Sequence, residues 1–191
     1  MASRALAVAV ISLGVAGAAR AQVDSYTIDV THTAVYYEYP HLDLSTNRGR
    51  FSVKGGTVQF DPAGRSGRVD LTIDTSSVNS GVVLMNRKMQ GPDLFDSADF
   101  PTGRFLADRF EFDGDKLVAV QGQLTLRGRS NPVTLSARRF NCYFNPLLER
   151  RTCGGDFDTT IQRSQWAIDW GLGMGMPDAV HLLIQVEAIQ Q

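Results

Sequence analysis

Histidines are the side chains in this sequence best suited to acid–base or metal chemistry, and there are three of them: His32, His41 and His181. Their spacing forms neither an H-x-x-x-H pair nor an H-E-x-x-H motif, either of which would place two imidazoles on one helix face for zinc. Two of them could still meet in the folded chain. Hydrogen-bonded histidines on strands or loops are the simpler interpretation.

Other segments with catalytic or binding character are each incomplete. Asp93, Asp96 and Asp99 recur every three residues but lack the spacing and the glycine of an EF-hand loop, so capping of short helices explains them better. Residues 64–67 (GRSG) are one residue short of G-x-S-x-G. Residues 171–176 (GLGMGM) lack the strand–turn–helix setting of a phosphate loop, and a mobile loop fits them better. Its methionines and Trp170 could line a portal or simply pack within the loop, and the sequence favours neither. We therefore expect no catalytic residues, no metal, no cofactor and no enzymatic activity.

The first residues of the chain differ from the rest. Arg4 precedes an apolar run that ends in Ala19-Arg20-Ala21, an A-x-A site. This predicts a signal peptide over residues 1–21 and one mature domain over residues 22–191. A membrane-anchoring helix is the alternative, but the run is shorter than the roughly 20 apolar residues that a span needs. We expect cleavage near Ala21/Gln22 and a periplasmic or secreted protein.

Export would place Cys142 and Cys153 in an oxidising compartment, where a disulfide between them is the expected state. Such a bond would stabilise the fold by about 3 kcal/mol in the chain-entropy model. A metal-binding or nucleophilic role is the alternative, although no histidine lies near either cysteine in the sequence.

Composition points to one ordinary globular domain. The chain has 191 residues, of which 43% are hydrophobic and 20% charged, and its net charge is −1. Lysines and arginines are scattered along the chain, so no basic stripe suggests nucleic acid.

The elements that must position these residues are mainly strands, because apolar and polar residues alternate with period two. In one such segment Val35, Tyr37, Tyr39 and His41 share a face. Turn sequences separate the segments, and strands spaced in this way without intervening helices indicate an antiparallel sandwich or barrel. Further alternating segments cover residues 58–60, 69–73, 118–126 and 180–188, and the turns cover 61–64, 113–115 and 127–132.

The alternation stops between residues 76 and 100, where Val82, Met85 and Met89 have helical spacing and Gly91-Pro92 ends the helix. We interpret this segment as a short helical insert that caps one end of a barrel. A small barrel can fill its interior with side chains or keep space for one ligand, and both give the same alternation.

Several segments together resemble the YceI-like family of exported lipid-binding proteins. They follow the family's order over nearly all of residues 25–189, with Ala167 in place of the usual glycine and Thr33 in place of the usual serine. The segments are Tyr26–Thr33 (YTIDVTHT), Gly49–Phe51, Asn86–Asp96, Phe100-Pro101, Gly122–Gly128 with Pro132–Leu135, Ile161–Trp166 and Val186–Ala188.

The resemblance implies an all-β fold, an extended antiparallel eight-stranded lipocalin-like barrel with an apolar tunnel. It also implies a non-covalently held long-chain lipid: a polyisoprenoid, a quinone-like lipid or a fatty amide. Arg87 and Lys88 are candidates for contact with a lipid head group. Residues expected to line the tunnel, if they are not simply packed core, are Val35, Tyr37, Tyr39, His41, Phe51, Val58, Phe60, Leu71, Ile73, Phe105, Val120, Leu124, Leu126, Ile168, Leu182, Ile184 and Val186.

Transient membrane contact and a homodimer are further possibilities that the resemblance raises. Two other functions stay open at this point. One is an envelope stress or interaction domain with a filled barrel and no ligand. The other is a lipid- or quinone-linked redox enzyme, which would need a clustered acid, base or metal site.

Overall fold

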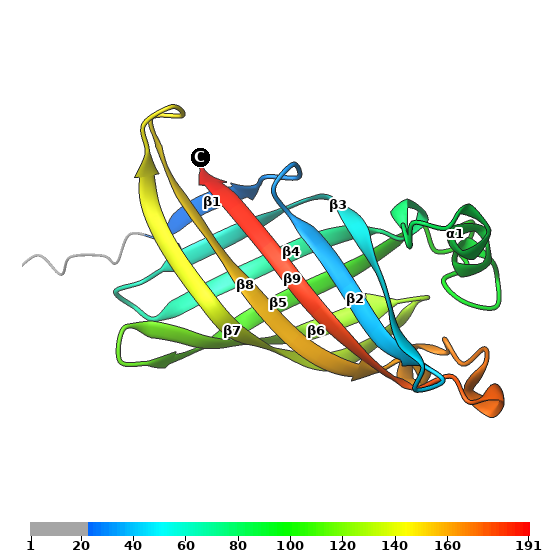
Figure 1. Cartoon of the computed structure of the whole chain (residues 1–191). Helices are drawn as coiled ribbons and strands as arrows, with labels where there is room; N and C mark the ends of the chain where they lie inside the picture. The colour runs from blue at the N-terminus through cyan, green and yellow to red at the C-terminus, as the bar shows by residue number, and fades with distance from the viewer. Residues whose placement is uncertain (1–22) are drawn as a thin grey trace, which may run out of the picture.

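The structure is a computed structural model, and it describes residues 23–191. The predicted signal peptide lies outside these residues. The described chain forms one long barrel of tilted strands (Figure 1). None of its helices is long and apolar enough to cross a membrane.

Nine strands make up the sheet, and every pairing between neighbours is antiparallel. The strands are β1 (Asp24–Ile28), β2 (Ala34–His41), β3 (Ser45–Asp61), β4 (Ser66–Asp74), β5 (Thr102–Asp113), β6 (Lys116–Leu126), β7 (Arg129–Asn145), β8 (Arg150–Gln162) and β9 (Ala179–Gln190). Helical segments are η1 (Thr75–Ser77), α1 (Val83–Gln90), η2 (Arg163–Trp166) and η3 (Leu172–Met174).

The sheet closes on itself because β3 pairs with both β2 and β4. β1 and β2 lie end to end between β3 and β9: β1 pairs with residues 57–60 of β3, and β2 pairs with residues 45–52. The nine strands therefore fill eight positions around the barrel. This confirms the predicted eight-stranded antiparallel barrel and adds a break in one strand, which the sequence pattern did not reveal.

Turns that the sequence predicts lie between β3 and β4 and between β5 and β6. The segment 127–132, expected to be one connection, is different. Only Arg127 and Gly128 form the turn, both with positive φ (46° and 69°), while residues 129–132 pair with β6. Two consecutive residues at positive φ suit a two-residue hairpin turn, so the strand resumes at once.

The predicted helical insert lies between β4 and β5 and contains η1 and α1. Met89 is the buried residue of α1, and the helix ends where the Gly91 amide donates to the Lys88 carbonyl at 3.1 Å. The insert covers one end of the barrel together with the segment of η2 and η3 (Figure 1). We call this the mouth end. The far end carries β1 and the β3–β4, β5–β6 and β7–β8 turns.

Candidate ligand-binding site

A cavity of about 240 Å³ lies inside the barrel toward the mouth end, and it is lined almost entirely by apolar side chains. A smaller cavity of about 80 Å³ continues toward the far end. The two share Leu71, Phe105, Leu135 and Ile184 as lining residues. They form an inner space along the barrel axis, and we call them the main cavity and the inner cavity.

The alternation of inward and outward residues along each strand explains which side chains form the cavity wall. Inward residues of β2, from Val35 to His41, face the main cavity, while Tyr36 and Glu38 between them do not. Every residue expected to line a tunnel borders one of the two cavities, and its contact with a ligand stays a prediction. The main cavity is bordered by Val35, Tyr37, Tyr39, His41, Phe51, Leu71, Ile73, Phe105, Leu124, Leu126, Ile168, Leu182 and Ile184, and the inner cavity by Val58, Phe60, Val120 and Val186.

Other lining residues were missed by the sequence reading. Met85 and Met89 come from the insert and Trp170 and Met176 from the segment after η2, where no strand alternation marks an inward face. The sequence does suggest Trp170 and the methionines of residues 171–176 as portal residues, and Trp170 and Met176 border the cavity, so only Met85 and Met89 of these four carried no such expectation. Val133, Leu135 and Val180 lie on alternating strands, so their parity was a signal that could have found them.

Polar groups of the main cavity gather near its mouth. The Tyr39 hydroxyl accepts a hydrogen bond from Asn47 Nδ2 at 3.2 Å, and His41 lines the same region. Deeper inside, the Tyr37 hydroxyl donates to Met89 Sδ at 3.2 Å. Burial raises the pKa of Tyr37 to about 12, so this phenol is neutral at any ordinary pH.

Arg163, at the start of η2, is the cationic side chain that borders the main cavity in the described chain. Its Nε donates to the Pro177 carbonyl at 2.8 Å, and its Nη1 donates to the carbonyls of Ile168 and Trp170 at 2.7 and 2.9 Å. Burial lowers the pKa of Arg163. The guanidinium therefore holds the segment after η2 in place at the mouth.

Arg87 and Lys88, the predicted head-group residues, border neither cavity. Arg87 is exposed. Lys88 pairs with Asp93, and its Nζ lies 4.5 Å from the centroid of the Trp170 ring. Because Trp170 itself borders the cavity, Lys88 sits at the outer edge of the mouth, where its contact with a head group remains a prediction.

Similarity to known proteins agrees with this geometry, because the YceI-like domain matches residues 26–188. The chain belongs to the YceI-like family. Protein YceI of Escherichia coli O157:H7 is 30% identical over 181 residues, which cover 94% of this chain and 92% of the relative. This match extends the relationship over nearly the whole length of both proteins.

Solved YceI-like structures have the same fold. The Campylobacter jejuni YCEI protein aligns with a TM-score of 0.67 at 25% identity, covering 80% of this chain and 90% of that one. A polyisoprenoid binding domain from Saccharophagus degradans, implicated in plant cell wall breakdown, aligns with a TM-score of 0.62 at 16% identity, covering 89% and 100%. The second likeness concerns the fold alone.

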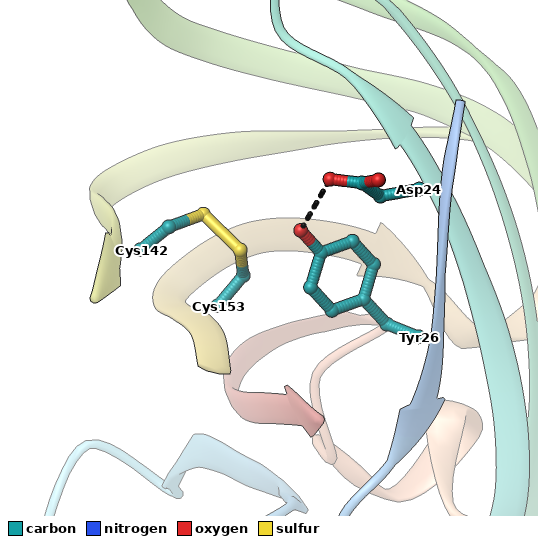
Figure 2. Close-up of a disulfide and its surroundings, with 4 residues drawn as sticks. All are labelled: Asp24, Tyr26, Cys142 and Cys153. Carbon is teal, nitrogen blue, oxygen red and sulfur yellow. Dashed lines mark hydrogen bonds between the residues drawn. A yellow bond between two sulfur atoms is a disulfide. The ribbon is translucent and has the colours of Figure 1, made fainter. Parts of the chain in front are cut away.

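At the far end, this YceI-like barrel carries the predicted disulfide between Cys142 of β7 and Cys153 of β8. Figure 2 shows it beside Tyr26, whose hydroxyl donates to Asp24 Oδ2 at 3.4 Å. Tyr26 and Cys153 both border the inner cavity. Within residues 23–191, no three His, Cys, Asp or Glu side chains are grouped so that they could hold a metal ion.

Proposed function

We propose that this protein is a carrier that holds one long-chain apolar lipid, a polyisoprenoid, non-covalently inside the barrel. The observation that carries the proposal is the main cavity of about 240 Å³, walled by apolar side chains and continued by the inner cavity. An engineered apolar cavity of about 150 Å³ already binds benzene. A larger apolar space therefore favours an apolar guest over ordered water.

The shape of the space favours a chain over a compact molecule, because the two cavities follow one another along the barrel. Each buried methylene contributes about 0.8 kcal/mol, so several isoprene units outweigh the cost of ordering the chain. The description of the Saccharophagus degradans domain as polyisoprenoid binding supports this ligand class. No bond needs to be made or broken in such a function.

A head group would lie at the mouth, among Tyr39, His41 and Asn47, with Lys88 at the outer edge. A few polar groups at an apolar pocket are enough to fix a ligand's orientation. We also propose that the protein acts outside the cytoplasm, in the periplasm or beyond. The Cys142–Cys153 disulfide supports this location, because such bonds persist in oxidising compartments.

Mass spectrometry of organic extracts tests the proposal. The full chain is expressed in a host that exports it and purified under native conditions, and then any bound lipid is extracted. We expect one long-chain isoprenoid per protein. A protein that carries no lipid and takes up no added prenyl lipid would contradict the proposal and favour a filled interaction domain.

Two neighbouring residues provide a matched pair of variants. Leu182 points into the main cavity, whereas Leu183 lies on the outer face of β9 and is exposed. Leu182→Trp should lower prenyl-lipid affinity by at least about tenfold, because the indole occupies the space of the chain. Leu183→Trp should leave the affinity unchanged. Equal affinities for the two variants would place the lipid outside the barrel.

A further inference from the structure

Four consecutive apolar residues at the start of the insert helix are exposed to solvent. Val82, Val83, Leu84 and Met85 are all exposed, and Leu84 is 75% exposed. A run of exposed apolar side chains costs solubility and gains nothing in the isolated fold. Such patches usually mark a surface that meets another apolar surface.

The same end of the barrel exposes apolar side chains from two further segments. Leu42 and Leu44 lie in the β2–β3 turn, with Leu44 83% exposed, and Met174 lies in η3. These segments adjoin each other, since a Cβ built on Gly175 would lie 3.3 Å from Leu42 Cδ2. We call residues 82–85, Leu42, Leu44, Trp170 and Met174 together the apolar rim.

The apolar rim and the main cavity share two residues. Met85 and Trp170 border the cavity and are also exposed on the outside, at 39% and 41%. Lys88 Nζ lies 4.5 Å from the Trp170 ring and so links the helix to that part of the rim. A ligand leaving the cavity along this wall would pass from buried to exposed apolar surface.

Charges beside the rim are of both signs: Arg87 is exposed on the insert helix, and Asp43 is exposed in the β2–β3 turn. Lys88 pairs with Asp93, and Arg48 pairs with Glu38 at 2.9 Å. A polybasic patch would attract anionic lipids from a distance, but interspersed charges of both signs form no such patch. Apolar insertion is the contact that this surface favours, and it depends on buried apolar area instead of lipid charge.

We propose that the apolar rim docks on the surface of a lipid bilayer, zwitterionic lipid being sufficient, and that the ligand passes there between membrane and barrel without crossing water. The inference rests on the proposed function. The reason for docking is kinetic: each methylene of the ligand that must enter water during release slows the ligand's escape from the barrel by about fourfold. A carrier whose mouth is open to solvent would release a long chain far too slowly, whereas a mouth pressed into a bilayer offers a continuous apolar path.

The β7–β8 hairpin supplies a control at the opposite end. Tyr143, Phe144, Leu147 and Leu148 are exposed at its tip, with Leu147 92% exposed, but none of them borders either cavity. The hairpin projects from the far end in Figure 1. It is as apolar and exposed as the rim and lacks the connection to the ligand space.

Vesicles of phosphatidylcholine test the proposal with two double variants of the full chain. Val83→Asp with Leu84→Asp changes the rim without touching the cavity wall, and Phe144→Asp with Leu147→Asp changes the hairpin. Flotation measures vesicle binding, and a fluorescent prenyl lipid measures transfer between vesicles. We expect the rim variant to lose both by at least about tenfold, the hairpin variant to lose neither, and wild-type binding to change less than about twofold with added salt.

Three outcomes would overturn the proposal: loss of vesicle binding in the hairpin variant alone, no vesicle binding by the wild type, or light scattering that shows a dimer which the rim variant dissociates. The last result would make the rim an interface between two copies of this chain. Prenyl-lipid affinity in solution, measured on the same variants, separates the two proposals. Vesicle binding without any prenyl-lipid affinity would contradict the carrier function and would still support the docking surface.

Discussion

Phe60 on β3 meets Phe140 on β7 at the far end, with ring centroids 5.3 Å apart. Four steps separate β3 from β7 in either direction around the eight positions, so this contact spans the barrel. At the mouth end Tyr37 on β2 meets Phe51 on the neighbouring β3 at 5.7 Å, and Phe51 meets Phe95 of the insert at 4.9 Å. Aromatic rings therefore span the interior between opposite strands at the far end, whereas at the mouth end they join one wall to the insert.

The segments without regular strands account for the rest of the difference between the far end and the mouth end. At the far end, tight turns connect the strands, and the inner cavity holds about 80 Å³. At the mouth end the insert and the segment after η2 stand over the opening, and about 240 Å³ stays open. Arg127 ties these segments together by donating to the carbonyls of Ala167 and Pro92 at 2.6 and 3.0 Å. One barrel thus combines a packed core with a binding cavity.

The largest expected effect comes from removing the ring that spans the far end. Phe60→Ala should lower the free energy of unfolding by about 3–5 kcal/mol, because a packed site loses both transfer energy and contacts. Leu182→Ala at the mouth should cost only about 2 kcal/mol, near the lower limit for such changes, because its side chain already borders empty space. Urea unfolding measures both, and equal losses would mean that the two ends are packed alike.

Loss of the disulfide should affect stability and spare binding. The double variant Cys142→Ser, Cys153→Ser should lower the free energy of unfolding by about 3 kcal/mol, since the unfolded chain regains the freedom of the closed loop. Prenyl-lipid affinity should change by less than about twofold, because neither cysteine borders the main cavity and serine nearly keeps the size of Cys153 at the inner one. Reduction of the parent protein should reproduce the loss. A fall in affinity as large as the fall in stability would show that the two ends are coupled.

Period-two alternation predicted most of the barrel and its lining, because a strand's inward face is determined locally. It assigned Leu124 and Leu126 to the inside, and both border the main cavity. It could not reveal that Phe60 reaches Phe140, because that contact depends on which strands lie opposite each other after closure. The packed end and the open end therefore looked the same in the sequence.

The mouth was the part least accessible from the sequence. Helical spacing located the insert, but it did not show that Met85 and Met89 turn toward the barrel axis. Arg163 belonged to a motif that indicated the family, while its hydrogen bonds to three carbonyls depend on the fold of residues 168–177. Irregular segments lack a repeating inward direction, and so their contribution to a site needs coordinates.

The dependence of affinity on the length of the polyisoprenoid should reveal how far the ligand reaches toward the far end of the barrel. Val186 borders the inner cavity, and Val186→Phe should shorten the available space. We expect about a tenfold loss of affinity for a long polyisoprenoid, since a few methylenes are displaced, and no loss for a shorter one. Leu183→Phe, on the outer face of the same strand, is the control. An equal loss for both chain lengths would indicate distortion of the barrel instead of a shortened tunnel.

The smallest expected effect concerns a ladder of charges outside the mouth half of the barrel. His181 Nδ1 and Nε2 lie 3.2 Å from Glu38 Oε1 and from Asp158 Oδ2, respectively, and Arg138 also pairs with Asp158. The hydrogen bond with Glu38 raises the pKa of His181. The hydrogen bond with His181 lowers the pKa of Glu38, and the one with Arg138 lowers the pKa of Asp158.

The raised histidine pKa and the lowered carboxyl pKa values stabilise the fold in different pH ranges. A raised histidine pKa stabilises the fold below the unfolded pKa of 6.5, and this contribution disappears as pH rises through the folded pKa. Lowered carboxyl pKa values stabilise the fold above the unfolded values of 4.5 for Glu38 and 3.8 for Asp158, and this contribution is lost as pH falls through the folded ones. The ladder should therefore stabilise most between about pH 4.5 and 6.5.

His181→Gln should accordingly lower the free energy of unfolding by less than about 1 kcal/mol at pH 5.5, and by less still at pH 8, because the pairs are partly open to solvent. His32 offers the comparison nearer the far end. Hydrogen bonds from Thr31 and His32 lower the pKa of Asp29 to about 2, but His32 is exposed on the β1–β2 turn. His32→Gln should change the pH profile of urea unfolding less than His181→Gln does, because Thr31 makes the largest contribution to the lowered pKa of Asp29. A larger effect at His32 than at His181 would mean that the break between β1 and β2, and not the ladder, makes the barrel sensitive to pH.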